Sequence, residues 1–428
     1  MQQHDWSRAN RARLNRPTAR IVWLALVMVY SATYSIHAQS LTWLGTFGNP
    51  YSSARDVSDD GSVVVGSSRF DNYNRAFRWT RTGGMQNLGT LPQHTYSEGY
   101  GVSADGNRVT GTAYYVIPYG GSERAFLWVF GSGMRDIGNL PGSPVNTALD
   151  ISRDGATIVG WGRDYGYAIR AFRWTSGTGM VSLGTLGGNE SRANGVSRDG
   201  SVVVGWSYNH LGERWAFYWM RAAGMQVLYP LAVCCGEANA VSDNGQIIVG
   251  RSHSAQTERW HACMWAWDGY GYSVSDLGTL GGNESVAQGC TNNREVVGWA
   301  HTTSGARRAF RWTPNGGMEN LSETFARLLS PGSYLEIAFA ITPDGRYIVG
   351  QGYNAAAGRT EAFLLDTRCV THNGDIDDNG CVDDADLLAV LFAFGGAGQD
   401  LGRVDTNCDG VVDDADLLMV LFNFGQGC

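Results

Sequence analysis

Several features that are common in enzymes are missing from this chain. It has no lysine, so all 32 of its Lys and Arg positions are arginine, and charged residues make up only 17% of it. There is no Gly-x-Ser-x-Gly, phosphate loop or dinucleotide fingerprint, and the eight histidines form no metal-binding pair. With 58 glycines against ten prolines, the composition instead favours a β-rich, turn-dense protein.

Negative charge is concentrated at one end of the chain. Residues 369–428 hold twelve Asp and one Arg, whereas residues 1–38 hold five Arg and one Asp. Of the formal net charge of −8, only about −1 is therefore left for residues 39–368. A nearly neutral body offers no electrostatic surface for nucleic acid, so we expect no nucleic-acid partner.

The N-terminus is typical of a secretory signal peptide. Five arginines between Arg8 and Arg20 precede the apolar stretch 21–36, and Ala38 offers a small residue for cleavage. This stretch is shorter than the ~20 residues that span a bilayer, so cleavage is favoured over a membrane anchor. We therefore predict a signal peptide at 1–38, an extracellular or cell-surface location, and no membrane association after cleavage.

The last sixty residues contain one calcium-binding pattern twice, in the segments 375–386 and 405–416. Oxygen-bearing side chains stand at positions 1, 3, 5, 9 and 12 and glycine at position 6, while position 7 contributes its backbone carbonyl. The predicted ligands are Asp375, Asp377, Asn379, Cys381, Asp383 and Asp386 in the first loop, and Asp405, Asn407, Asp409, Val411, Asp413 and Asp416 in the second. The sequence thus predicts two bound calcium ions.

Each calcium loop is followed by an apolar stretch that ends at a glycine, Gly395 or Gly425. Asp384 and Asp414 stand where a helix would begin, where the helix dipole favours a carboxylate. Glycine just past the last helical turn is a usual stop signal. Each copy therefore predicts a loop followed by a helix.

This duplicated loop–helix pattern resembles the type I dockerin module over residues 373–425. The resemblance implies a small α-helical, calcium-binding module at 369–428, with a cohesin-like or cell-surface protein as its partner. Dockerins of cellulase complexes carry Ser or Thr at loop positions 10 and 11. This chain has Asp384-Ala385 and Asp414-Ala415 there.

Between the two ends, one unit recurs seven times, and its successive turns lie 45 to 51 residues apart. The turns are Asp60-Gly61, Asp105-Gly106, Asp154-Gly155, Asp199-Gly200, Asn244-Gly245, Asn293-Arg294 and Asp344-Gly345. Each unit predicts four strands, with the patterns Ala-x-x-Val-Ser, Val-Val-Val-Gly, Arg-Ala-Phe-Arg-Trp and Leu-Gly-Thr-Leu. Four strands in about 45 residues is the size of a propeller blade.

The two ends of the repeat region predict a closed ring. The region begins with a spare fourth strand at 41–46, and its seventh unit stops after a third strand at 361–365. The first strand can complete the last blade and so remove two open sheet edges. We predict an all-β, seven-bladed β-propeller with four-stranded blades at 39–367.

The Leu-Gly-Thr-Leu-Gly-Gly, Asp-Gly and Arg-Ala-Phe-Arg-Trp strings resemble the HAF family of bacterial extracellular repeats over about residues 41–366. This resemblance implies export and brings no established catalytic residue. Arg75, Arg124, Arg170 and Arg308 recur at equivalent places in the repeat. They predict either an anion-binding ring at the channel or, as we favour, stacking on nearby tryptophans and pairing with carboxylates.

Two functions remain open at this point. The favoured one is a secreted or cell-surface binding or scaffold protein, in which the propeller presents ligand-binding loops and the calcium-loaded module docks or stabilises. The alternative is a glycan-active enzyme or enzyme subunit, of the O-glycosyl hydrolase type, recruited through the module. Two close carboxylates in a channel pocket would indicate the enzyme.

The eight cysteines in an exported chain suggest disulfides. For the C-terminal module we predict a clasp between Cys369 and Cys428, with Cys369–Cys381 and Cys408–Cys428 as the main rival pairing. Two interpretations remain for Cys263 and Cys290: a bridge that joins two blades, or two buried small apolar side chains.

Overall fold

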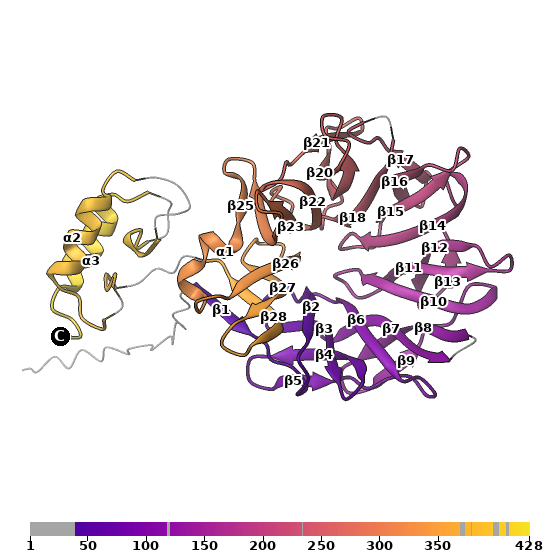
Figure 1. The fold of residues 1–428 in the computed structure, drawn as a ribbon, viewed down its shortest axis with the longest axis horizontal. Coiled ribbons are helices and arrows are strands. Elements are labelled where there is room, and N and C mark those ends of the chain that lie inside the picture. The colour runs from indigo at the N-terminus through magenta and orange to yellow at the C-terminus, as the bar shows by residue number, and fades with distance from the viewer. Residues whose placement is uncertain are drawn as a thin grey trace, which may run out of the picture. The chain divides into compact units, whose positions relative to one another are not determined.

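The computed structural model describes residues 39–117, 120–232, 234–368, 373–377, 379–396, 402–407 and 411–428. The predicted signal peptide at 1–38 lies outside these residues. Residues 39–368 form seven four-stranded antiparallel sheets arranged as a β-propeller, and the residues from 373 onward form a small helical module (Figure 1). In the part of the chain that the structure describes, no helix has the length and apolar character needed to cross a membrane.

Each blade is a meander whose strands follow one another from the ring axis outward. Blades one to three consist of β2 (Ser52–Val57), β3 (Val63–Phe70), β4 (Tyr73–Thr80), β5 (Gly84–Asn87), β6 (Tyr96–Val102), β7 (Arg108–Ile117), β8 (Gly120–Val129), β9 (Gly133–Asp136), β10 (Gly142–Ile151), β11 (Thr157–Asp164), β12 (Ile169–Thr175) and β13 (Gly179–Ser182). Blades four and five consist of β14 (Gly187–Val196), β15 (Val202–Asn209), β16 (Arg214–Met220), β17 (Gly224–Leu228), β18 (Gly236–Val241), β19 (Ile247–His253), β20 (Trp260–Trp267) and β21 (Tyr272–Asp276). Blades six and seven consist of β22 (Gly281–Cys290), β23 (Val296–Thr302), β24 (Arg307–Thr313), β25 (Gly317–Asn320), β26 (Tyr334–Ile341), β27 (Tyr347–Asn354), β28 (Arg359–Asp366) and β1 (Ser40–Trp43). The prediction of a seven-bladed propeller is confirmed.

The N-terminal strand completes the last blade, as predicted. β1 pairs antiparallel with β28, from Ser40 opposite Asp366 to Trp43 opposite Phe363. The Trp43 and Phe363 rings also meet edge to face, with centroids 6.4 Å apart. The ring is therefore closed by strands from the two ends of the propeller.

The glycine that recurs in every second strand permits a close approach of two strands. A Cβ atom on Gly66 would lie only 2.0 Å from the carbonyl oxygen of Ser53 on β2 and 3.0 Å from the Phe77 ring on β4. The partner of this glycine on the third strand is fully buried in six blades: Phe77, Phe126, Phe172, Phe217, Phe310 and Phe363. Blade five has the buried Cys263 at the same place.

The fourth strand lies slightly earlier in the repeat than predicted. In blade one it is β5, with the sequence Gly-Met-Gln-Asn, and the predicted Leu-Gly-Thr-Leu segment follows it as a connection to blade two. Gly89 in this connection has a φ of +76°, which an extended strand cannot contain. Leu88 and Leu91 on either side of it are buried between the blades, which explains their regular recurrence.

The helical module consists of two copies of a loop and a helix. Helix α2 spans Asp384–Ala393 and α3 spans Asp414–Asn423, and both begin at the predicted aspartate. The module core contains four fully buried valines, which are Val382, Val390, Val412 and Val420. The remaining helical elements are α1 (Leu321–Thr324) and the 3-10 turns Ala326–Leu328 and Gly402–Val404.

Backbone hydrogen bonds tie each loop of the module to the end of the other helix. Gly395 donates to the Val412 carbonyl at 2.8 Å, and Gly425 donates to the Val382 carbonyl at 2.8 Å. Because the two bonds are equivalent, the copies are related as a pseudo-symmetric pair. This explains why the two helices align without a gap and keep the same buried and capping positions.

Candidate functional site

Each innermost strand contains one β-bulge at the same place. In β2 the register with β3 shifts between Ala54 and Asp56, so Arg55 has no partner in the ladder. The same shift occurs in all seven blades. The residues at the shift are Arg55, Tyr100, Leu149, Asn194, Asn239, Gln288 and Phe339, which we call the bulge ring. A bulge commonly re-aims a side chain towards a functional site.

The bulge ring lines a cavity of about 190 Å³ between the innermost strands. All seven of its side chains contribute to the wall, one from each blade. Their chemistry differs around the ring. Arg55 lies between the aromatic Tyr100 and Phe339 of the two neighbouring blades, whereas blades four to six contribute the carboxamides Asn194, Asn239 and Gln288.

The Arg55 guanidinium is stacked and unpaired. Its central carbon lies 4.1 Å from the Phe339 ring centroid and 5.9 Å from that of Tyr100. Its Nε is buried and has no hydrogen-bond partner, and Arg55 makes no ion pair with any described residue. Tyr100, by contrast, donates its hydroxyl hydrogen to Glu98.

Three carboxylates, Asp56, Asp150 and Asp243, also line the cavity, and the pKa values of the first two are raised. Burial raises the pKa of Asp56. Burial, together with the charge of Asp56, raises the pKa of Asp150 to about 7. Each of these two carboxylates accepts a hydrogen bond from the next blade: Asp150 Oδ2 from Val196 N at 2.9 Å, and Asp56 Oδ2 from Val102 N at 2.8 Å. Both therefore hold neighbouring blades together.

An ion-pair network crosses the channel at the end where the Asp-Gly turns lie. Arg153 of blade three lies 3.6 Å from both Asp56 and Asp59 of blade one. Arg198 of blade four pairs with the same Asp59, and with Asp243 of blade five at 2.8 Å. Since blades one and four lie on opposite sides of a seven-bladed ring, these pairs span the channel.

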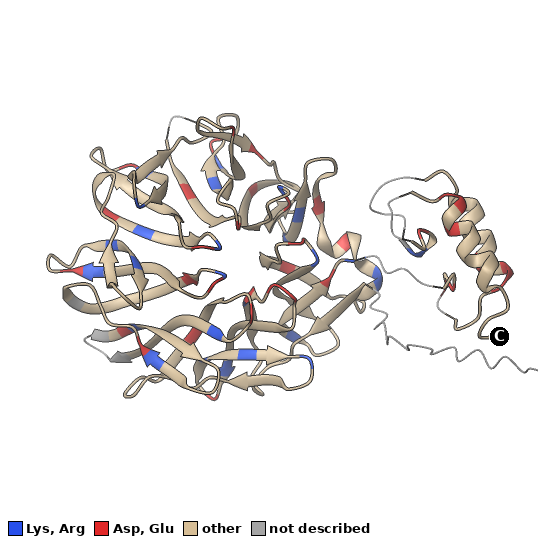
Figure 2. Ribbon diagram, turned by 180° about the vertical axis from the view of Figure 1, so that it is seen from behind, with Lys and Arg blue, Asp and Glu red and all other residues tan. Residues whose placement is uncertain are grey.

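The four arginines singled out by the repeat lie on third strands, away from the cavity. Arg124 pairs with Asp136 at 3.2 Å and Arg170 with Asp164 at 3.2 Å. Arg75 and Arg308 stack on Tyr73 and Tyr334 rather than on tryptophans. Pairing with carboxylates is thus confirmed for two of the four arginines, whereas the predicted stacking on tryptophans is wrong because the rings are tyrosines. These residues do not form a ring at the channel. Figure 2 shows basic and acidic residues interspersed over the blades.

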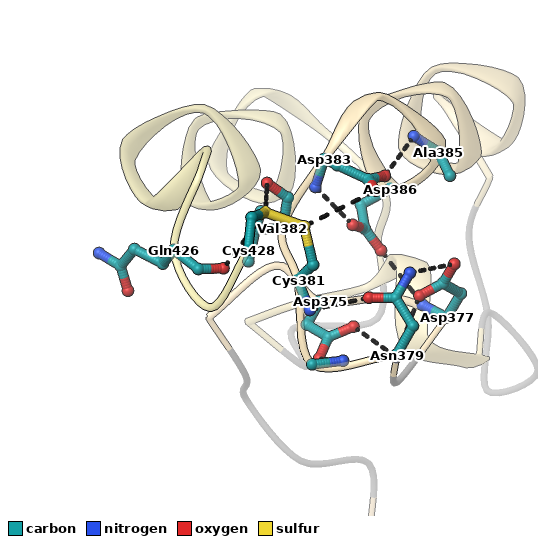
Figure 3. Close-up of a disulfide and its surroundings, with 11 residues drawn as sticks. Asp375, Asp377, Asn379, Cys381, Val382, Asp383, Ala385, Asp386, Gln426 and Cys428 are labelled. Atoms are coloured by element: carbon teal, nitrogen blue, oxygen red, sulfur yellow. Dashed lines mark hydrogen bonds between the residues drawn. A yellow bond between two sulfur atoms is a disulfide. The ribbon is translucent and has the colours of Figure 1, made fainter.

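The first predicted calcium loop brings three of its carboxylates together. One oxygen each from Asp375, Asp377 and Asp386 lies within 4.8 Å of the others (Figure 3). Asn379 lies beside them, and its amide donates to Asp377 at 3.0 Å. Asp383 caps helix α2 by accepting a hydrogen bond from Ala385 N at 2.8 Å.

Asp386 organises the first loop from inside. It is fully buried, and its carboxylate accepts hydrogen bonds from Asp377 N at 3.2 Å and from Asp383 N at 2.9 Å. Asp416 holds the same place in the second loop, accepting from Asn407 N and Asp413 N at 3.1 and 2.9 Å. Asp405 is buried and Val411 exposed, while Asp409 lies outside the described residues.

Cys381 and Cys428 form a disulfide that joins the first loop to the end of the chain (Figure 3). This pairing overturns the predicted clasp between Cys369 and Cys428, and both bridges of the rival scheme. The reason lies in the fold: residues just past α3 pair with the first loop, as in the hydrogen bond from Val382 N to the Gln426 carbonyl. Cys369 and Cys408 lie outside the described residues.

The remaining cysteines lie in the propeller. The adjacent Cys234 and Cys235 form a disulfide in the connection before β18. Cys263 and Cys290 are free thiols, so the predicted bridge between blades is wrong. Cys263 is fully buried, which confirms the alternative interpretation for that residue, whereas Cys290 is partly exposed and lines the cavity.

The bulge ring was missed at the sequence level, although a signal for it exists. In the Ala-x-x-Val-Ser pattern, the first x is Arg, Tyr, Leu, Asn, Asn, Gln and Phe in the seven copies. When a position varies while its neighbours repeat, the fold of the blade does not require a particular residue there. Such positions are candidates for ligand contact, and here all seven line the cavity.

No protein-family model matches the chain, and no curated protein matches it. TolB from Acinetobacter baumannii is similar at 16% identity and a TM-score of 0.38, over 51% of this chain. The chain covers only about half of that protein, 54% of its length. The β-propeller domain of the Trilobed protease from Pyrococcus furiosus aligns at 11% identity with a TM-score of 0.44, over 78% of this chain and 95% of that one. These similarities are confined to the propeller architecture.

Proposed function

We propose that the chain is an exported binding protein in which a propeller presents a ligand-binding channel and a calcium-loaded module docks to a partner. The convergence of Asp375, Asp377 and Asp386 in the first loop is the observation that carries this proposal. Three carboxylates within 4.8 Å of one another repel unless a cation lies between them.

The donor set fits calcium. Asp375, Asp377, Asn379, Asp383 and Asp386, with the Cys381 carbonyl, offer oxygen ligands only, as calcium prefers, and the second loop offers the same set from Asp405 to Asp416. The ion would neutralise the carboxylates and fix the loop against its helix. Two ions per chain are proposed.

Exposed apolar side chains on the helices support a docking role for the module. Phe392 is 87% exposed and Phe422, at the equivalent place on α3, is 80% exposed. Leu388, Leu391, Leu418 and Leu421 are also about half exposed. Contiguous apolar surface of this kind marks a protein interface. The resemblance to dockerins supports a cohesin-like or cell-surface protein as the partner.

Disulfides support export. The pairs Cys234–Cys235 and Cys381–Cys428 belong to an oxidising compartment, since cytosolic thiols are kept reduced. The resemblance of the repeats to the HAF family points to the same location, outside the cell or at its surface.

A glycan-active hydrolase is the second candidate, because Asp56 and Asp150 line one cavity and the pKa of Asp150 is raised to about 7. A carboxyl with such a pKa suits a general acid. The hydrogen bonds of both residues to neighbouring blades favour a structural role instead. Hydrolysis of a polysaccharide by the native chain, lost on Asp150→Asn, would establish the enzyme.

Titration of calcium into the chelator-stripped chain tests the proposal. We expect heat changes that fit two sites in native protein and one site in the Asp377→Ala variant, which removes the side-chain oxygens altogether. Asp377 suits this test because it is exposed, so its replacement leaves the valine core intact. The matched control is Asp384→Ala, which removes an equally exposed carboxylate outside the cluster and should leave two sites. No calcium uptake by the native chain would overturn the proposal.

A further inference from the structure

We propose that the channel cavity binds a small hydroxylated carboxylate, such as a sugar acid, with Arg55 as the residue that binds its carboxylate. This inference rests on the proposed role of the propeller as the ligand-binding part of the chain. It goes further by naming the chemical class of the ligand and the residues that would recognise it.

The state of Arg55 is the first step in the argument. An arginine whose Nε is buried without a partner has lost its hydrogen bonds to water and has no protein hydrogen bond at that nitrogen in exchange. Stacking against Phe339 holds the guanidinium plane in place and leaves its edge open for hydrogen bonds in that plane. A carboxylate is the planar acceptor that matches such an edge with two parallel bonds.

The other charged side chains around the cavity already have polar partners, whereas Arg55 has no ion-pair partner among the described residues. Arg153 lies close to Asp56 and Asp59, and Asp243 pairs with Arg198. The Asp150 carboxylate accepts hydrogen bonds from two backbone amides, those of Ile151 and Val196. An anion that enters the cavity can therefore pair with Arg55 without displacing an existing ion pair.

Carboxamide side chains on the opposite wall can bind the hydroxyl groups of the ligand. Asn194 and Asn239 each use one amide hydrogen to bond a backbone carbonyl of the next blade, at 2.9 and 2.8 Å, which fixes their side chains. Gln288 contributes a third carboxamide to this wall. Fixed carboxamides carry both donors and acceptors, which is the combination that hydroxyl groups require.

Size and access set further limits on the ligand. A volume of about 190 Å³ is far more than one water needs, yet below the 300–1,000 Å³ typical of drug-sized ligands. The channel therefore suits one small acid or a single terminal sugar. The ion pairs from Arg153 and Arg198 cross the turn end of the channel, so the ligand enters from the opposite end.

Calorimetry of the full chain with defined probes tests this inference. The probes are D-glucuronate and D-galacturonate, each beside its neutral sugar, with acetate as a carboxylate that lacks hydroxyls. We expect at least one of the two sugar acids to bind, and the neutral sugars and acetate to bind at least about tenfold more weakly, because a hydrogen-bonded charge pair is lost or hydroxyl contacts are missing. The ligand could be a free sugar acid or the terminal uronate of a glycan, and an oligosaccharide with a terminal uronate distinguishes them. Tighter binding than the free acid indicates a glycan end, and weaker binding indicates a free acid.

The Arg55→Gln variant should weaken binding of the acid about ten- to a hundredfold. Its matched control is Arg192→Gln, because Arg192 also has a buried, unpartnered Nε and stacks on Trp161 and Trp206 but does not line the cavity. Equal melting temperatures of the two variants show that folding is not the cause. Unchanged binding by Arg55→Gln, or no binding of either acid and of the oligosaccharide by the native chain, overturns the inference. Calcium uptake is measured on the same samples. If they bind calcium but no sugar acid, the inference about the channel ligand fails while the proposed calcium-binding module stands.

Discussion

The propeller and the C-terminal module are both built from sequence repeats, yet they hold together by different means. Each blade packs a fully buried phenylalanine or Cys263, together with buried valines and isoleucines of its second strand, against the two neighbouring blades. Because the ring is closed, every blade has two neighbours. The module has four fully buried valines, two ten-residue helices and a disulfide. Helices of that length are marginal in water by themselves, so the module depends on cross-links that the blades do not need.

Calcium removal should give the largest difference between the two parts. Saturation of two sites at a hundred times their dissociation constants stabilises a module by about 5 kcal/mol. We therefore expect EDTA to abolish the helical circular dichroism signal while the thermal transition of the propeller stays in place. A helical signal unchanged by EDTA would show that the valine core and the disulfide suffice.

Deletion of residues 41–46 should have the next largest effect, and only on the propeller. It removes Trp43 and the buried Leu44 and exposes the edge of β28. We expect a loss of about 3–5 kcal/mol from two large apolar side chains, followed by association through the open edge. The control is Thr42→Ser, which keeps the strand. A monomeric deletion variant with the native melting temperature would argue against closure by β1.

Cys428→Ser should destabilise the module and leave the propeller untouched. The Cys381–Cys428 bridge closes a loop with a sequence separation of 47, for which the chain-entropy estimate is about 4 kcal/mol. We expect a lower melting temperature of the helical signal and a stronger dependence on calcium. Cys263→Ser is not a suitable control because that thiol is buried, so the native chain under reducing conditions serves instead.

Asp150 should produce the smallest effect, a slope in the pH dependence of propeller stability. Its pKa is raised to about 7 in the folded protein from 3.8, so the folded state holds a proton that the unfolded state has released. Stability therefore falls as pH rises from about 4 to 7, by about 1.4 kcal/mol per pH unit, so that the fall between pH 5 and 8 stays below about 3 kcal/mol. Asp56, Asp243 and Arg153 line the same cavity. Asp150→Asn should flatten this slope, measured by urea titrations at pH 5 and 8. The control is Asp105→Asn, which should leave the slope unchanged, because a hydrogen bond from the Ser103 hydroxyl lowers the pKa of Asp105 in the native chain.

The repeats made the ring predictable, because turn, glycine and aromatic positions recur in a fixed order. The blade boundaries were less accurate, since Leu88 and Leu91 have the apolar pattern of a strand while Gly89 between them has a positive φ. The cysteine pairing failed for another reason. It depends on which segments lie side by side in the folded module, and Cys428 lies next to Cys381 only because the chain after α3 pairs with the first loop.

The candidate sites differ in the same way. The proposed calcium ligands stand close together along the chain, so their spacing alone predicts the cluster that Asp375, Asp377 and Asp386 form. The bulge ring takes one residue from each blade, across about 280 residues, and a backbone irregularity decides where it points. The sequence marks these seven positions only by their variation within a repeated pattern, and that variation does not show that the backbone bulges there.

The bulge has a consequence for how this protein can change. Because a bulge residue takes no part in the pairing of the ladder, its side chain can be exchanged without disturbing the sheet. Each blade thus contributes one exchangeable side chain to the wall of the common cavity. Substitutions at these seven positions can change the ligand specificity of the cavity one blade at a time, while the propeller ring stays the same.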